Sequence, residues 1–293
     1  MKCSFIIPSL GRQKELQKCL SSIINSYEYI NNRVEIEILV VINGGNCDSS
    51  FLDIKYPEIT EIYTLKEKGN SRARNYGIKK SRGDYLFFLD DDAFVREDFI
   101  KVLFENIKKN EAQAFCGRLL NPQDNSPFTK VYRNDTSKYL YHFDYHYLGG
   151  TELVIKREII ERIGFFDENF GPGAKYYAAE QTDLFFSLLR ANIKVKYVPE
   201  LIIFHPVVND TPPEKVYYYS YGMGAALIKH LFSEYRSFFI YFLIILNILL
   251  RSALRSLQIM LFPRSIRCIN NRFRFFDVFR GTLLGMVGYL KYR

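Results

Sequence analysis

Three consecutive aspartates close an apolar run in the segment RGDYLFFLDDDAFVRED, residues 82–98. Residues 85–89 form the kind of continuous apolar stretch found in buried parallel strands. The aspartates could cap a helix that begins near Phe94, because Asp accepts from free backbone N–H groups, or they could form an exposed turn. A helix cap needs only one carboxylate, so it does not explain three. An exposed turn does not explain why the aspartates directly follow an apolar strand that is expected to be buried. The placement therefore favours a hard divalent cation with oxygen ligands.

The aspartates sit within a regular alternation of strand and helix. Strands are expected over residues 4–8, 36–42, 59–65 and 85–89, and helices over 13–27 and 71–80. Parallel strands joined by crossover helices form an open α/β sheet. Ligands of such sheets bind beyond the carboxyl ends of the strands. The aspartates follow the last of these strands, so we expect them at a ligand site.

The second half of the chain is less regular. Residues 121–147 are polar and aromatic with little periodicity, whereas residues 180–192 predict a helix. Two short strands are expected next, over residues 193–199 and 201–206. A further helix is expected over residues 216–232.

The charge of the chain is uneven along its length. Residues 1–214 hold 28 Lys and Arg against 30 Asp and Glu, a net −2, whereas residues 215–293 hold 12 against 2, a net +10. Residues 238–250 are uncharged and almost wholly apolar. A spanning helix needs about 20 apolar residues, and Arg251 and Arg255 interrupt the continuation of this run. An interfacial or re-entrant helix pair on an anionic membrane surface is therefore favoured.

Other interpretations of the C-terminal region are also possible from the sequence. It could be a small helical domain that docks on the sheet, or an oligomer interface. A nucleic-acid partner is not expected, because no recognised nucleic-acid motif accompanies the basic residues. The five cysteines have neither zinc-site nor disulfide-framework spacing, and the N-terminus lacks a secretory apolar region. We expect a cytoplasmic protein, peripheral or monotopic at the inner face of the cell membrane, with a domain at 1–213 and a membrane-associating region at 214–293.

The ordered set of segments resembles family 2 of the inverting nucleotide-sugar glycosyltransferases, which have the GT-A fold, a Rossmann-like open mixed sheet flanked by helices. The resemblance covers about residues 3–206 and is most specific where G-x-x-x-A-R-N-x-G precedes a hydrophobic strand and D-x-D. The segments that carry it are SFIIPSLGR, LVVINGG, GNSRARNYGIKKSRGDYLFFLDDD, GFFDENFG, AEQTDLFFSLLRANIKVKYVP and IIFHP.

The resemblance implies roles for the aspartates. In this family the D-x-D carboxylates meet a Mg²⁺ or Mn²⁺ ion that bridges the donor diphosphate, so Asp90 and Asp92 map onto them. Asp90 is expected toward the ribose of the donor and Asp92 toward the metal. Asp91, which shares the donor-site motif, points to the opposite strand face and is expected to have a structural or capping role. The metal would offset the repulsion of the carboxylates and neutralise charge on the departing nucleoside diphosphate.

Other donor contacts are implied by the resemblance. Arg74 resembles the family residue that approaches the nucleotide, although it could be a solvated helix charge. Pro8, Ser9 and Arg12 lie on the loop after the first strand, where the family contacts the nucleotide, and Arg12 could be a surface charge. The usual Asp after the second strand is replaced by Ile42, so base recognition must use other groups, such as Asn43 or Asp48.

The expected catalytic segment departs from the family. Relatives read G-E-[DE]-x-D, whereas residues 179–183 read Ala-Glu-Gln-Thr-Asp, and Gln181 cannot accept a proton. Inversion needs a carboxylate that takes the acceptor's proton. Glu180 is the expected base and Asp183, on the same helix face, the group that orients base or acceptor. Asp183 could also be a charge at the helix N-terminus, and a chain without its base would be an accessory subunit.

His205 follows the last expected strand, where many relatives place a histidine near the diphosphate or metal. Imidazole can bind a transition metal such as Mn²⁺. The alternative interpretation is that His205 is a hydrogen-bonded histidine of the core.

The sequence therefore predicts a hexosyltransferase-type enzyme of polysaccharide biosynthesis that moves a sugar from a nucleotide donor to a glycan or lipid-linked acceptor. UDP-sugar is the default donor from the habits of the family. The alternative is a non-catalytic nucleotide-sugar or glycan-binding subunit of another transferase. A homo-oligomer is left open.

Overall fold

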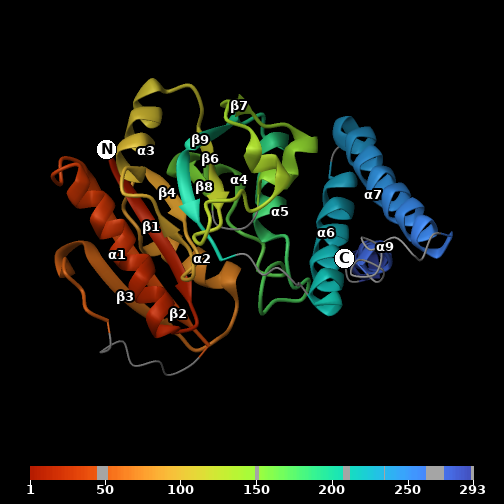
Figure 1. Cartoon of the computed structure of the whole chain (residues 1–293), viewed down its shortest axis with the longest axis horizontal. Coiled ribbons are helices and arrows are strands. Elements are labelled where there is room, and N and C mark those ends of the chain that lie inside the picture. Colours follow the sequence, from red (N-terminus) through yellow and green to blue (C-terminus); the bar gives the residue numbers. More distant parts are fainter. Residues whose placement is uncertain (45–51, 149–151, 207–211, 234, 262–273, 292–293) are drawn as a thin grey trace. The chain divides into compact units, whose positions relative to one another are not determined.

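The computed structural model describes residues 1–44, 52–148, 152–206, 212–233, 235–261 and 274–291. The chain divides into two compact units (Figure 1). Unit 1 comprises Met1–Phe166 and Leu188–Val207, and unit 2 comprises Asp167–Ser187 and Val208–Arg293. The division therefore groups residues 167–187 with the C-terminal helices.

Unit 1 is built on a mixed sheet of nine strands in the order β3-β2-β1-β4-β8-β6-β9-β5, with β7 paired to β9. The strands β1 to β4 are mutually parallel where they pair, whereas β8 runs antiparallel to β4 and β6. The strands are β1 Lys2–Ser9, β2 Glu35–Asn43, β3 Thr60–Leu65, β4 Tyr85–Phe88, β5 Phe94–Val95, β6 Ala114–Leu120, β7 Lys138–Tyr139, β8 Leu153–Lys156 and β9 Val195–Phe204. The expected open mixed sheet is confirmed.

The helices of unit 1 follow the predicted alternation. The first helix buries Leu16, Leu20 and Ile23, which recur at helical spacing. The segment 121–147 contains short 3-10 turns rather than long elements. The helices and turns are α1 Gln13–Tyr29, η1 Pro57–Ile59, α2 Asn70–Lys80, α3 Phe99–Lys109, η2 Lys130–Arg133, η3 His142–Tyr147 and α4 Arg157–Ile163, and α5 Glu180–Arg190 continues from unit 2 into unit 1.

The expectation of two strands over residues 193–206 is wrong, because a single strand, β9, covers this region. Its pairing with β6 shifts in register between Cys116 and Arg118, where the partners move from Tyr197 to Ile202. Pro199 lies inside the shift and has no N–H to give to the ladder. An irregularity therefore accommodates the proline that suggested a strand end.

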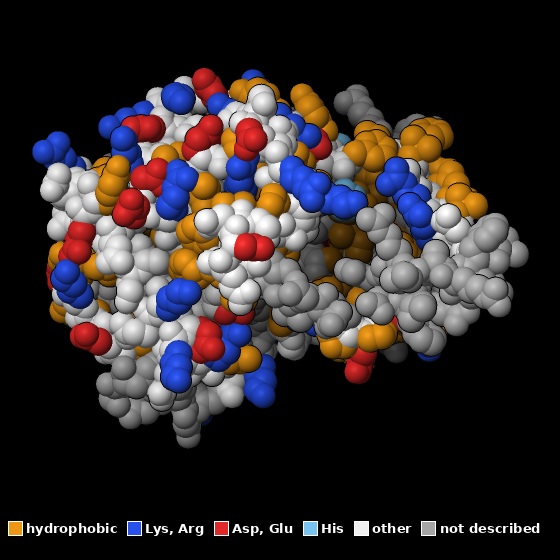
Figure 2. Space-filling model, viewed as in Figure 1, with side chains coloured by type: hydrophobic (Ala, Val, Ile, Leu, Met, Phe, Trp, Pro, Cys, Tyr) orange, Lys and Arg blue, Asp and Glu red, His pale blue; other side chains and the backbone are white. Residues whose placement is uncertain are grey.

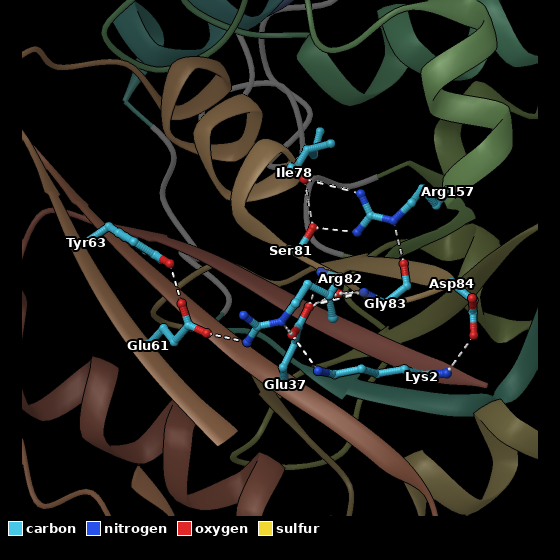
Figure 3. A network of polar contacts seen from close by, with 11 residues as sticks. Lys2, Glu37, Glu61, Tyr63, Ile78, Ser81, Arg82, Gly83, Asp84 and Arg157 are labelled. Atoms are coloured by element: carbon cyan, nitrogen blue, oxygen red, sulfur yellow. Dashed lines mark hydrogen bonds and ion pairs between the residues drawn. The ribbon is translucent and has the colours of Figure 1, made fainter. Parts of the chain in front are cut away.

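The amino edge of the parallel strands is held by Glu37, a buried carboxylate on β2 (Figure 3). It accepts hydrogen bonds from Ser4 Oγ at 2.7 Å, from the backbone N–H of Gly83 at 3.1 Å and from the backbone N–H of Arg82. Lys2 Nζ forms an ion pair with it at 2.7 Å. These contacts join β1 and β2 to the turn that leads into β4, at the opposite end of the strands from the aspartates.

Among its described residues, unit 2 contains three long helices, α6 Pro213–Leu231, α7 Tyr235–Leu261 and α9 Arg274–Lys291. The first and last pack closely, because a Cβ added to Gly224 would meet the carbonyl of Thr282 and one added to Gly285 would meet the carbonyl of Tyr221. Such glycines let helix backbones approach each other. The predicted helix over residues 216–232 is confirmed within α6.

The helix α7 is longer than the apolar run suggested. Arg251 and Arg255 do not end it, since both continue the helix as exposed side chains. Among the described residues, one helix is long and apolar enough to cross a membrane by length and composition, namely α7 over Phe238–Gln258. The expectation that the run is too short to span is therefore corrected. Figure 2 shows hydrophobic side chains over α7 with Lys or Arg side chains beside them. Its exposed large apolar residues are Phe239, Phe242, Leu243, Leu246, Leu250, Leu254 and Leu257.

Candidate functional site

The carboxyl edge of the sheet brings together residues that are far apart in sequence. Asp90 and Asp92 follow β4, and His205 follows β9. One ligand atom from each of the three lies within 4.8 Å of the other two. All three side chains are partly exposed. This geometry groups the three residues predicted to bind metal.

The ring of His205 is oriented as a metal ligand requires. Its Nδ1 lies 3.0 Å from the carbonyl oxygen of Pro206, so Nδ1 carries the proton and donates it. Nε2, the ring nitrogen left to bind a metal, lies 3.5 Å from Asp92 Oδ1. Metal-binding histidines commonly donate their other N–H to a backbone carbonyl in this way. Two carboxylates and an imidazole suit Mn²⁺ or Mg²⁺, with Mn²⁺ the better match to a nitrogen ligand.

Arg74 is a fully buried arginine on α2, with its side chain 0% exposed. Its Nη2 lies 2.7 Å from Asp90 Oδ1, and its guanidinium lies over the ring of Phe166 with 5.3 Å to the centroid. The alternative of a solvated helix charge is therefore excluded. The contact orients Asp90 and offsets its charge, because a buried charge requires a partner.

Asp91 is buried and belongs to a different set of contacts. Ser9 Oγ donates to Asp91 Oδ2 at 2.6 Å and accepts from the N–H of Gly11 at 2.9 Å. Arg12 donates to Asp91 and, through Nη1, to Asp92 Oδ2 at 3.0 Å. The hydrogen bond to Asp91 raises the pKa of Arg12 further above its ordinary value. Asp91 therefore connects the loop after β1 to the loop after β4. Arg12 connects Asp91 to Asp92, one of the three residues predicted to bind metal.

The other predicted donor residues lie at the same edge. The expectation that Pro8 and Ser9 lie on the loop after the first strand is corrected, because β1 extends to Ser9 and Pro8 is buried within it opposite Val41. The amide of Asn43 donates from Nδ2 to the carbonyl of Ser9 at 3.1 Å and accepts at Oδ1 from the N–H of Gly69 at 3.0 Å. Asn43 thus joins the end of β1 to the loop before α2. Asp48 lies outside the described residues.

The two predicted catalytic carboxylates belong to unit 2. Glu180 begins α5 and is 9% exposed, while Gln181 and Asp183 are more deeply buried. The segment before the helix is strained, because Tyr177 and Ala179 have φ values of 60° and 69°. Side chains other than glycine rarely adopt this left-handed region, and such strain gathers at functional sites.

Asp183 is fully engaged by two residues of α6. Lys229 Nζ lies 2.8 Å from Asp183 Oδ2, and His230 Nε2 lies 2.9 Å from Oδ1. Burial raises the pKa of Asp183, but the hydrogen bond from His230 and the charge of Lys229 outweigh this effect, so the pKa lies below its ordinary value. A lowered pKa makes Asp183 a weak proton acceptor.

Lys229 and His230 were missed by the sequence analysis. Lys229 also reaches Asp167 Oδ2 at 2.9 Å. The signal was available, because a Lys-His pair interrupts the apolar stretch AALIKHLF of an expected helix. A charged residue on a buried helix face needs a partner of opposite charge. Sequence alone did not say which carboxylate that partner would be.

A Rossmann-like mixed sheet with a D-x-D pair and a histidine at its carboxyl edge defines a protein of the GT-A class. The chain belongs to glycosyl transferase family 2, because residues 4–164 match the sequence model of that family. The predicted family, fold class and transferase class are confirmed.

Curated relatives share parts of this chain. The glycosyltransferase GlyA of Streptococcus pneumoniae is 32% identical over 119 residues, which are 40% of this chain and 16% of GlyA. The poly(ribitol-phosphate) β-N-acetylglucosaminyltransferase TarP of Staphylococcus aureus is 27% identical over 121 residues, 40% of this chain and 36% of TarP. The match therefore spans well under half of either relative.

A solved structure supports the fold. The crystal structure of a TarS fragment from S. aureus in complex with UDP-GlcNAc matches with a TM-score of 0.55 at 14% identity. The match covers 78% of this chain and 67% of that one. At this identity the likeness concerns the fold alone.

Proposed function

We propose that this chain is a metal-dependent inverting glycosyltransferase that moves a sugar from a nucleoside diphosphate donor to a glycan or lipid-linked acceptor. The observation that carries the proposal is the group of Asp90, Asp92 and His205, within 4.8 Å of one another at the carboxyl edge of the sheet. Open α/β sheets bind their ligands at this edge. Family membership supports the reaction class.

The residues of unit 1 supply the donor side of the reaction. When bound, Mg²⁺ or Mn²⁺ would neutralise the charge that develops on the diphosphate leaving group. Asp90, Asp92 and His205 would hold the metal. Arg74 keeps Asp90 in place, and Arg12, which is 46% exposed, is free of the packing that confines Arg74. The Arg12 guanidinium can therefore turn toward a phosphate oxygen of the donor.

The residues of unit 2 supply the proton acceptor. Inversion in one displacement requires a base for the acceptor hydroxyl. We assign that role to Glu180, because Asp183 is held by Lys229 and His230 and its pKa is lowered. Gln181 has no basic oxygen that could accept the proton.

We infer a UDP-sugar as donor, on the support of the fold match to TarS in complex with UDP-GlcNAc. The acceptor is inferred to be a cell-surface polymer or its lipid-linked precursor, since TarP is named for transfer to poly(ribitol-phosphate). The exposed apolar side chains of α7 and the basic C-terminal region support action at the inner face of the membrane.

Metal removal tests the donor site. Mn²⁺ titration by calorimetry, with and without UDP, and turnover of a panel of UDP-sugars are measured on the full chain. Turnover is expected to stop in EDTA and return with Mn²⁺. Asp92→Ala should lower both Mn²⁺ affinity and turnover by about 100-fold, because it removes a charged ligand. The control is Glu105→Gln, which removes an exposed carboxylate on α3 and should change neither. Full turnover in Asp92→Ala would contradict the proposal.

A second candidate is a nucleotide-sugar-binding subunit without activity of its own, and Gln181 in place of the usual carboxylate favours it. The two candidates differ in cells that carry the variants. If nucleotide binds to the protein but Glu180→Ala and Asp183→Ala leave the cellular glycan unchanged, the non-catalytic candidate is correct.

A further inference from the structure

A partly buried network of charges, centred on the buried Asp183, joins α6 to the segment that carries the predicted base. Lys229 Nζ lies between Asp167 Oδ2 at 2.9 Å and Asp183 Oδ2 at 2.8 Å, and also over the ring of Phe170 at 5.1 Å from the centroid. His230 binds the other oxygen of Asp183. All of these residues belong to unit 2. The C-terminal part of the chain therefore contributes side chains to the segment around α5.

The ring of His230 is held in one orientation. It is 0% exposed and packs between Phe186 of α5 and Tyr241 of α7, with centroids 5.4 and 5.6 Å away. Because Nε2 lies 2.9 Å from a carboxylate oxygen, Nε2 carries a proton and donates it. Nδ1 is buried without a hydrogen-bond partner among the described residues. A ring confined in this way has one good contact, and that contact is Asp183.

Asp183 lies one helical turn from Ala179 and donates its backbone N–H to the Ala179 carbonyl at 2.8 Å. Glu180 follows Ala179 directly, and Ala179 has the strained left-handed backbone. A strained residue persists only when its surroundings hold it. The side-chain contacts of Asp183 are suited to hold this turn, since both carboxylate oxygens are engaged.

We propose that Lys229 and His230 are positioning residues, which hold Asp183 and thereby set the first turn of α5 and the direction of Glu180. The inference rests on the proposed function and deepens it. Asp183 acts in this arrangement as an anchor for α5 rather than as a base. The Lys-His pair makes the C-terminal region a part of the catalytic machinery as well as a membrane-binding element.

A double-mutant cycle on Lys229 and Asp183 separates an effect on the position of Glu180 from an effect on the stability of the fold. Lys229→Met leaves the buried Asp183 without its lysine, and Asp183→Asn leaves the partly buried Lys229 with Asp167 alone. Each variant is expected to lower the midpoint of thermal unfolding by about 5–10 °C. The double variant Lys229→Met/Asp183→Asn removes both charges of the pair and leaves Asp167, whose side chain is 26% exposed, to be solvated by water, so it should recover most of that loss. Lys215→Met is the control, because it removes an exposed lysine from the same helix.

The decisive comparison is between the double variant and the wild-type protein. We expect the double variant to unfold near the wild-type temperature and to bind UDP and Mn²⁺ normally, while kcat for sugar transfer stays lower by about 10- to 100-fold, because small displacements of catalytic groups are costly. Recovery of kcat together with stability would overturn the inference, since it would mean that the pair only stabilises the fold.

Amide hydrogen exchange of the peptide around residues 179–187 gives a readout that does not need activity. Faster exchange of this peptide in the double variant, with unchanged exchange in β1 and α1, is the expected result. If the wild-type protein transfers no sugar from any donor, the proposed function fails. The exchange measurement then decides the inference alone, and unchanged exchange at the start of α5 would refute it.

Discussion

The two arginines beside the aspartates differ in burial, and this difference separates their roles. Arg74 is fully buried against Phe166 and serves Asp90, whereas Arg12 is 46% exposed and serves Asp91 and Asp92. A buried guanidinium is confined by its packing, while an exposed one can change partners at small cost. We therefore expect Arg74 to shape the site and Arg12 to respond to what binds there.

Glu180 is the residue whose role is most directly testable. Glu180→Gln keeps the size and polarity of the side chain but removes its ability to accept a proton. We expect kcat for transfer to fall by about 10²–10⁴-fold, the usual contribution of a general base. UDP affinity, measured by calorimetry, should not change.

Glu105→Gln on α3 is again the matched control for the loss of a carboxylate. If Glu180→Gln retains the wild-type kcat, another group accepts the proton and the assignment of Glu180 fails. If transfer is lost together with UDP affinity, Glu180 acts in binding rather than as the base.

At the scale of elements, the sheet has a structural edge and a functional edge. Parallel strands place all their amino ends on one side and all their carboxyl ends on the other. Glu37 and its partners close the amino edge (Figure 3). The aspartates, Ser9 and His205 gather at the carboxyl edge. Strand direction therefore separates the groups that stabilise the sheet from those that are proposed to bind the metal and the donor.

Glu37→Gln should destabilise unit 1 by about 2 kcal/mol, because hydrogen bonds and ion pairs to the charged carboxylate are weakened. Chemical denaturation at neutral pH measures the change. Burial raises the pKa of Glu37, but hydrogen bonds from the Arg82 backbone, Lys2 and Ser4 outweigh it and leave the pKa below its usual 4.5.

The lowered pKa gives the pH dependence its sign. The contribution of Glu37 is fully present above pH 4.5, the ordinary value, and is lost as the pH falls through the lower folded-state pKa. The stability difference between wild-type protein and Glu37→Gln should therefore shrink on acidification. A difference that stays constant down to about pH 2 would show that the charge of Glu37 does not contribute.

At the scale of the whole molecule, the chain combines a sheet of the GT-A class with helices that expose apolar surface. Exposed leucines are ordinary when scattered, but those of α7 recur along one helix within residues 215–293, which have a net charge of +10. Apolar area and positive charge together favour an anionic bilayer.

Membrane binding is expected to depend on α7. The full chain should float with vesicles that contain phosphatidylglycerol and less with neutral vesicles. Leu250→Ser/Leu254→Ser should weaken binding about tenfold or more, because two apolar side chains lose their burial in lipid. Leu10→Ser is the control, since Leu10 is 64% exposed, as is Leu254, but belongs to unit 1.

Unchanged flotation of the double serine variant would place the membrane contact elsewhere. For the wild-type protein, alkaline carbonate extraction distinguishes a helix that lies on the membrane surface from one that spans the membrane. A surface-bound helix is released, whereas a spanning helix remains with the lipid.

The sequence by itself determined the alternation of strands and helices, the carboxylates after β4 and the family. These features are local, because apolar periodicity and a motif are read within one stretch of chain. It misread β9 as two strands, because a proline usually ends a strand and only the pairing with β6 reveals the register shift.

Only the tertiary structure decided which charges meet. The pairs Arg74 and Asp90, Arg12 and Asp91, and Lys229 and Asp183 are separated by 16, 79 and 46 residues. Partners so far apart are chosen by how the elements pack, and no local pattern encodes that choice. The carboxylates could be predicted from the sequence, but the cations that pair with them could not. A buried charge needs a partner of opposite charge, and the packing of the elements determines which residue is close enough to be that partner.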